Sequence, residues 1–269
     1  MSLYRGMDRT ALDAAYDNSA AVADSPRILA DWDARSASLR AARPQHLDLR
    51  YGTGERNRID YFAARPGAPV FVFIHGGYWQ MRAKETFAFL AAGPLAHGIS
   101  VALIAYTLAP AKRLDGIVAE VRAALDWLAS YLPNSAFFVS GWSAGAHLAA
   151  MTVTHPAVKG GLAISGIYDL EPIRLCYLND KLALDEQEAR RNSPLLHLPR
   201  YSPPLIMTYG TGELSELQRQ SSEFAAARTG AGLPGRLAPL AGHNHFTILE
   251  ELARPEGALT ALVRELVAQ

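Results

Sequence analysis

The sequence has one cysteine, no excess of charge of either sign and no long hydrophobic run. The single thiol, Cys176, excludes an intramolecular disulfide and is compatible with a reducing compartment. Lys plus Arg and Asp plus Glu both number 26, without blocks of like charge, which argues against a nucleic-acid partner or a polybasic membrane anchor. No signal-peptide core is apparent, and no segment approaches the roughly 18 apolar residues of a membrane span. We therefore expect a soluble, cytoplasmic protein that has no membrane partner and is either a monomer or a homodimer.

The order of apolar segments predicts a single α/β domain over residues 1–269. Helical spacing marks an N-terminal helical segment over 1–45, and alternating residues around a glycine-rich turn predict a hairpin before residue 63. From residue 69, apolar strands alternate with helical patterns, which predicts a mostly parallel sheet with helices on both faces. Residues 170–200 lack strand character and are expected to form a small helical cap at the carboxyl edge of the sheet. The expected strands after the hairpin are 69–74, 99–105, 136–139, 161–165, 204–209 and 235–240, and the expected helices include 84–92, 114–132, 214–228 and 246–268.

The most informative segment is Gly141-Trp142-Ser143-Ala144-Gly145, which follows a buried-strand pattern and opens into a helical one. In such a strand–turn–helix the serine occupies a strained turn, and side chains at the glycines would crowd the neighbouring strand and helix. A serine hydroxyl is a weak nucleophile until a base, an acid and an oxyanion site surround it. The segment therefore predicts that these partners lie elsewhere at the same sheet edge.

An oxyanion site is predicted by His75-Gly76-Gly77-Tyr78-Trp79, which directly follows the strand ending at Ile74. Two glycines allow a sharp turn that points amide N–H groups outward. Losing one such donor typically raises the barrier by ~2.7–4 kcal/mol. A plain glycine turn after a strand is the alternative interpretation, and pairing with the serine segment favours the oxyanion site. The expected donors are the amides of Gly77 and Tyr78, together with that of Ala144.

The general base is expected among the three histidines that follow residue 180: His197, His243 and His245. The last two lie in the loop after the final predicted strand, at the carboxyl edge where the serine lies. We assign His245, which is next to the closing helix and is followed by apolar Phe246, and keep His243 as the alternative. A metal-binding His-x-His pair would need an acidic or thiol ligand at suitable spacing, so no metal or other cofactor is expected.

The acid that orients the histidine is expected in the loop after strand 204–209, which contains Glu213 and Glu216 but no aspartate. Glu213 follows a Gly-Thr-Gly turn, so its side chain can lie in the loop and face the histidine. Glu216 falls in the first turn of the next helix, where an acidic residue complements the helix dipole, and is expected to be solvated. We therefore assign Glu213.

Other residue types of interest have a structural interpretation beside the functional one. His147 is expected to face the core, and Cys176 to be an inert thiol because no histidine accompanies it. Asp169 is expected to make structural hydrogen bonds, or to be the acid in a different layout. Three aromatic residues near the serine either line a substrate pocket or only pack: Trp79, Trp142 and Tyr168.

Together, segments 75–79 and 141–148 resemble the α/β-hydrolase fold, in its hormone-sensitive-lipase-like esterase branch. The tryptophan after His-Gly-Gly-Tyr is similar to the metal-independent kynurenine formamidases, as are the stretches 165–172, 213–221 and 245–249. The resemblance runs from about Leu47 to the C-terminus and includes the N-terminal helical segment. Members of that group generally carry aspartate where this chain has Glu213. The resemblance implies hydrolysis of N-formyl-kynurenine to kynurenine and formate, in a group that also includes esterases for short acyl chains.

The sequence thus leads to a cofactor-free serine hydrolase with Ser143 as nucleophile, His245 as base and Glu213 as the orienting acid. The expected substrate is a small molecule, either an N-acyl arylamine or a short-chain ester. Two other classes stay open. A non-catalytic binding protein of the same fold is disfavoured because every position that the chemistry needs is filled, and an acyltransferase would use the same residues.

Overall fold

The computed structural model describes residues 2–269 and, within them, one eight-stranded sheet. Its strand order is β1-β2-β4-β3-β5-β6-β7-β8, in which β1 and β2 are antiparallel and the six strands from β3 onward are mutually parallel. The fold predicted from the sequence is therefore confirmed. The strands are β1 (Leu49–Arg50), β2 (Arg58–Phe62), β3 (Val70–Ile74), β4 (Ser100–Ile104), β5 (Phe137–Trp142), β6 (Val158–Ile164), β7 (Leu205–Thr208) and β8 (Gly235–Leu237).

The elements follow the predicted pattern with three differences. The segment expected to be helical over 246–268 is divided into the 3₁₀ turn Thr247–Leu249 and two α-helices, α11 and α12. The segment expected as a helix over 84–92 is a 3₁₀ helix, Lys84–Ala91, that passes into α4. The last strand, expected over 235–240, ends at Leu237, and pairing resumes only as an isolated bridge at Leu240. The α-helices are α1 (Arg9–Ala15), α2 (Asn18–Ala21), α3 (Ser25–Ala42), α4 (Ala92–Ala96), α5 (Leu114–Tyr131), α6 (Ala144–Thr152), α7 (Glu171–Leu175), α8 (Asn179–Leu182), α9 (Glu186–Arg191), α10 (Ser215–Gly230), α11 (Glu250–Ala253) and α12 (Ala258–Val267).

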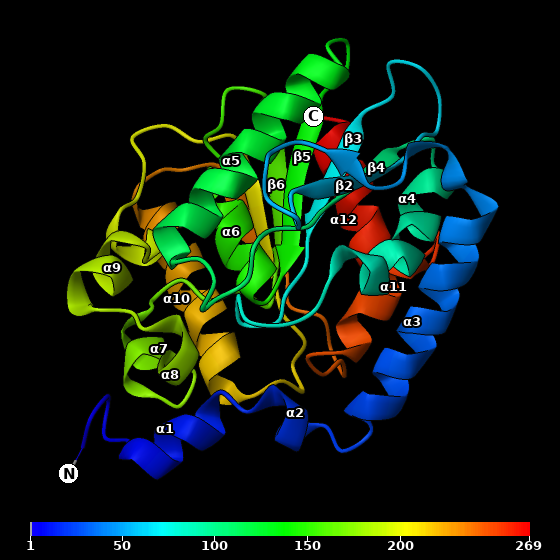
Figure 1. Cartoon of the computed structure of the whole chain (residues 1–269). Coiled ribbons are helices and arrows are strands. Elements are labelled where there is room, and N and C mark those ends of the chain that lie inside the picture. The colour runs from blue at the N-terminus through cyan, green and yellow to red at the C-terminus, as the bar shows by residue number, and fades with distance from the viewer. Residues whose placement is uncertain (1) are drawn as a thin grey trace.

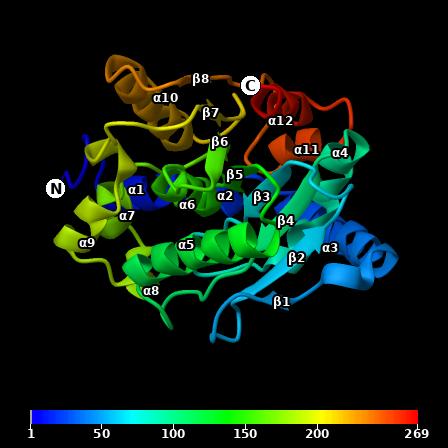
Figure 2. The same ribbon diagram turned by 90° about the horizontal axis from the view of Figure 1, so that it is seen from above.

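Both faces of the sheet are covered, which explains the unbroken apolar runs of the parallel strands. Along β3, Val70 and Val72 belong to the core beneath α5, α6 and α10, whereas Phe71 and Phe73 belong to the core beneath α3, α11 and α12. Figure 2 shows these two helical layers on opposite sides of the sheet. None of the helices within residues 2–269 combines the length and apolar character needed to cross a bilayer.

The strand order brings the loops of interest to one edge. In the sheet, β3 lies between β4 and β5. The connection after β3 runs to β4 on one side, whereas the connection after β5 runs to β6 on the other, so the two loops diverge around a crevice. The carboxyl ends of β6, β7 and β8 lie at the same edge. Figure 1 shows α1 and α2, in blue, beneath this edge, near α7 and α8 from the predicted excursion over 170–200.

A buried ion cluster joins the hairpin to the 3₁₀ helix beyond segment 75–79. Lys84 Nζ lies 2.6 Å from Asp48, 2.7 Å from Asp60 and 2.6 Å from Glu85, and the Asp60 side chain is fully buried. We expect Lys84→Met to lower the free energy of unfolding by about 3–5 kcal/mol, because Asp60 then keeps only Arg40 as a cationic partner. Urea denaturation measures this loss.

The matched control is Lys159→Met, at an exposed position of β6 without an ion pair among residues 2–269. A surface exchange of this kind is expected to change stability by no more than about 0.5 kcal/mol. Equal effects of the two exchanges would contradict a structural role for the Lys84 cluster.

Candidate active site

Ser143 occupies the predicted strand–turn–helix, between β5 and α6. Its backbone has φ 58° and ψ −120°, a strained conformation for a residue with a side chain. A Cβ at Gly145 would lie 2.0 Å from the Ile74 carbonyl oxygen, and one at Gly141 would lie 2.2 Å from the Gly145 carbonyl. Because only glycine permits these approaches, the start of α6 rests directly on the end of β3.

Glu213 and His245 meet in a buried hydrogen bond. His245 Nδ1 lies 2.7 Å from Glu213 Oε2, and the Glu213 side chain is fully buried. Its other oxygen, Oε1, accepts hydrogen bonds from Ser165 Oγ at 2.5 Å and from the Gly210 amide at 2.7 Å. With both oxygens engaged, the carboxylate holds the imidazole by Nδ1 and leaves Nε2 free to face a substrate.

Ser165 is absent from the residues that the sequence pointed to. It directly follows β6, and its φ of 53° directs it into the same edge of the sheet. The position after a parallel strand is a signal that could have identified it, because the other site residues share that position.

A cavity of about 30 Å³ lies beside Ser143 and is also lined by His245, Gly77, Tyr78 and Trp142. Trp142 Nε1 donates a hydrogen bond of 2.8 Å to the His245 carbonyl, and the two rings lie 4.7 Å apart. The residue before the serine thus fixes the histidine loop. The cavity is completed by Asn18, Ser19, Met81, Arg82 and Phe246.

For the three aromatic residues near the serine, the sequence left open whether they line a pocket or only pack, and the structure separates them. Trp142 lines the cavity, whereas Trp79 is fully buried and donates to His147 Nδ1 at 3.3 Å. Tyr168 is also fully buried and stacks on Phe224 with ring centroids 4.3 Å apart. Trp79 and Tyr168 are therefore packing residues, because neighbouring helices cover the rings that a bare sheet edge would expose.

The predicted oxyanion loop leaves amide groups without partners. Within residues 2–269, the N–H groups of Gly77, Tyr78 and Ala144 donate no hydrogen bond to another protein group. Gly77 has φ 104°, and a Cβ there would lie 2.3 Å from the Met81 carbonyl oxygen, so the turn requires glycine. Unpaired amides gathered near a serine form a binding site for a developing negative oxygen.

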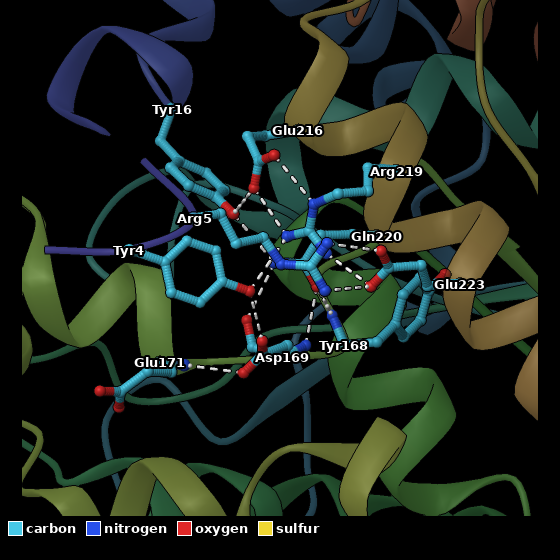
Figure 3. A network of polar contacts seen from close by, with 10 residues as sticks. All are labelled: Tyr4, Arg5, Tyr16, Tyr168, Asp169, Glu171, Glu216, Arg219, Gln220 and Glu223. Atoms are coloured by element: carbon cyan, nitrogen blue, oxygen red, sulfur yellow. Dashed lines mark hydrogen bonds and ion pairs between the residues drawn. The ribbon is translucent and has the colours of Figure 1, made fainter. Parts of the chain in front are cut away.

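Glu216 is buried and ion-paired, so its predicted solvated position is wrong. Its carboxylate lies 2.7 Å from Arg219 and accepts a hydrogen bond of 3.1 Å from Tyr16 (Figure 3). Burial opposes its ionisation, but Arg219 holds the pKa of Glu216 below its usual value. The helix start that looked exposed in the sequence is covered by the N-terminal segment.

The same network fixes the N-terminal segment over the sheet edge (Figure 3). Tyr4 donates to Asp169 at 2.7 Å, which agrees with the structural role expected for that aspartate. Gln220 Nε2 donates to Tyr16 at 3.0 Å, and the Tyr16 carbonyl accepts from Tyr78 at 2.7 Å. The oxyanion loop is thus tied to residues that precede the sheet.

The remaining candidates lie away from the cavity. His243 is 3.9 Å from Glu251, and His147 is fully buried, with its pKa lowered to about 4 by burial. Burial raises the pKa of Cys176 to about 11, which fits an inert thiol. His197 bonds to the Arg190 carbonyl at 3.0 Å. Among residues 2–269, no three His, Cys, Asp or Glu side chains are grouped to hold a metal ion.

The chain is similar to known proteins in both sequence and structure. Residues 71–202 match the model of an α/β-hydrolase fold family. Kynurenine formamidase of Danio rerio is 30% identical over 100% of both chains, and that of Salmo salar is 32% identical over 83% of this chain and 82% of its own. The chain belongs to the α/β-hydrolase family. This hydrolase is also similar to a proposed thioesterase from Silicibacter sp. TM1040, with a TM-score of 0.87 and 29% identity over 94% of this chain and 98% of the other.

We expect Gly145→Ala to destabilise the hydrolase by at least about 3 kcal/mol, at the upper end of overpacking costs, because the clash is with a strand carbonyl that cannot move freely. Thermal and urea unfolding followed by circular dichroism measure the change. Gly230→Ala is the matched control, since a Cβ there meets nothing within 4 Å and the residue ends α10. A tolerated Gly145→Ala would contradict the tight contact between α6 and β3.

Proposed function

We propose that this α/β hydrolase is a serine hydrolase that removes the formyl group from N-formyl-kynurenine or a closely related aryl formamide. The observation that carries the proposal is the 2.7 Å bond between His245 and Glu213, with Ser143 and His245 lining one cavity. Similarity over the full length of a kynurenine formamidase supports the choice of substrate. In this proposal Ser143, Glu213 and His245 form a catalytic triad.

The residues account for each step of acyl transfer. Ser143 Oγ attacks the formyl carbon as His245 Nε2 takes its proton, and the amides of Gly77, Tyr78 and Ala144 stabilise the negative oxygen. The C–N bond then breaks, and the arylamine leaves with the proton from His245. A water molecule attacks the formyl ester, again giving its proton to His245, and formate departs as Ser143 regains its hydrogen. Glu213 stays ionised and stabilises the imidazolium.

The size of the cavity supports a small acyl group. A cavity needs about 10–15 Å³ to hold one water molecule, so about 30 Å³ holds roughly two such groups. A formyl group contributes two heavy atoms and fits, and an acetyl group needs only a small displacement. A longer acyl chain would reach toward Met81 or Phe246, which line the cavity. The same observation favours a short-chain carboxylesterase as the second candidate function.

The substrate is tested by comparing kcat/KM for N-formyl-kynurenine, 4-nitrophenyl acetate and 4-nitrophenyl butyrate. We expect N-formyl-kynurenine to give the highest value and butyrate the lowest, because the cavity limits the acyl group. A preference for the two esters over N-formyl-kynurenine would remove the formamidase proposal and leave the esterase. Equal rates for acetate and butyrate would contradict the size argument.

The triad is tested by paired substitutions. Glu213→Gln should lower kcat about 10³–10⁴-fold, because a neutral amide supports the wrong tautomer of His245. Glu216→Gln removes a carboxylate that does not touch His245, so it should reduce stability more than kcat. His245→Ala should lower kcat far more than His243→Ala.

Covalent labelling separates the enzyme from a non-catalytic binding protein. A fluorophosphonate should label the folded wild-type chain on Ser143 and should not label Ser143→Ala. Folded wild-type protein that resists labelling would exclude the proposed nucleophile. An acyltransferase would label equally, and is recognised by a rate that rises with an added amine or alcohol acceptor while water alone gives little turnover.

A further inference from the structure

The cavity beside Ser143 contains a cation without a partner. Arg82 lines it, is half-buried, and its guanidinium makes no hydrogen bond or ion pair with any group among residues 2–269. Burial lowers the pKa of Arg82, and Asp33, the acid that opposes this shift, lies beyond ion-pair distance. Placing a charge in a half-buried position without a counter-ion costs free energy that a bound anion would offset.

The backbone holds Arg82 in this position. The Gln80 and Met81 amides both donate to the Gly77 carbonyl at 3.0 Å, and Arg82 follows with φ 74°. Its carbonyl accepts a hydrogen bond of 2.8 Å from Arg56, and its Cγ packs so closely on Gly77 that a Cβ there would lie 2.8 Å away. The backbone and Cγ of Arg82 are therefore held against the oxyanion loop.

Asn18 provides a second unpaired group at the same cavity. The Tyr78 hydroxyl donates its proton to the Tyr16 carbonyl, so it can only accept from Asn18, whose Nδ2 lies 2.8 Å away. This fixes the orientation of the amide and leaves Asn18 Oδ1 buried with no donor among residues 2–269. A buried acceptor without a donor costs about 1–3 kcal/mol, which a substrate N–H group would recover.

The N-terminal network makes the position of Asn18 a property of the fold. Tyr16, two residues earlier, is held by Glu216 and Gln220 of α10 (Figure 3). Asn18 begins α2, two residues after this anchor. The acceptor is therefore carried by a fixed segment rather than by a loop that could turn away.

We propose that Arg82 and Asn18 form a specificity subsite in which the guanidinium binds a substrate carboxylate and Oδ1 accepts a hydrogen bond from a substrate N–H group. The preferred substrates are then acyl amides of carboxylate-bearing amines, such as formylated amino acids, rather than neutral aryl formamides or simple esters. This inference rests on the proposed function, since it assigns contacts of the leaving group in that same acyl transfer.

The test compares kcat/KM for N-formyl-kynurenine with that for its methyl ester, which keeps the N–H groups and lacks the carboxylate. Arg82→Gln should reduce the ratio of the two values by about 10- to 100-fold, the range expected for a charge-assisted pair, mainly through KM of the acid. Arg82→Lys should retain part of the preference. Arg122→Gln, an exposed arginine that donates only to the Met151 carbonyl, is the control and should leave the ratio unchanged.

Asn18 is tested by a different ratio. Asn18→Ala should lower kcat/KM for both formamides about fivefold more than for 4-nitrophenyl acetate, which offers no N–H group. Equal losses on all three substrates would show that Asn18 only supports Tyr78. An acid-to-ester ratio that is unchanged in Arg82→Gln would overturn the carboxylate site.

Failure of the proposed function is recognised in the wild-type chain before any variant is compared. A chain that hydrolyses 4-nitrophenyl acetate and neither formamide is not a formamidase. The subsite is then measured by inhibition of acetate hydrolysis, where N-formyl-kynurenine should bind more tightly than its methyl ester and lose that advantage in Arg82→Gln. Equal inhibition by the two compounds would overturn the inference.

Discussion

The contact between Gly145 and the carbonyl of Ile74 is the constraint on which the whole site depends. It sets the distance between the start of α6 and the end of β3, and with it the distance between Ser143 and the loop after β3. That loop also approaches the serine, since a Cβ at Gly76 would lie 3.2 Å from the Ser143 Cβ. A larger residue at either glycine would separate the serine from the unpaired amides. Ser143 and the amides proposed to bind the oxyanion therefore form one packed unit.

A second constraint acts on the buried carboxylate of Glu213. It fixes the positions of the two carboxylate oxygens. Burying a carboxylate is costly unless hydrogen bonds replace its hydration. Ser165, the Gly210 amide and His245 supply three donors at 2.5–2.7 Å. Because these donors fix where both oxygens lie, a glutamate on a short turn can present a carboxylate to the histidine.

Features that depend on a few neighbouring residues were predictable from the sequence. The strands, the turn at Ser143 and the loop at Gly77 each follow from a pattern within a few residues. The meeting of Glu213 and His245 follows from the rule that parallel strands end at one edge. These predictions needed no knowledge of distant packing.

The environments of Glu216, Trp79 and Tyr168 depend on segments far away in the sequence. Glu216 is buried because Tyr16, 200 residues earlier, bonds to it. Trp79 is buried against His147, and Tyr168 against Phe224, in contacts that depend on how helices cross the sheet edge. An aromatic residue near a nucleophile has the same composition whether it packs or lines a cavity, so local pattern alone could not separate the two.

The proposed roles of Arg82 and Asn18 could not be predicted from the sequence, because they rest on polar groups that have no hydrogen-bond partner in the part of the chain that the structure describes. A sequence gives no indication that a guanidinium will remain unpaired in a chain with equal numbers of acidic and basic residues. The proposed triad and oxyanion amides would serve acyl transfer from any carboxylic acid derivative, so they cannot select a substrate. In our proposals, selection belongs to the residues that line the cavity: Met81 and Phe246 limit the acyl group, whereas Arg82 and Asn18 bind the leaving group. Related formamidases and esterases could then differ in these few side chains while the catalytic geometry stays the same.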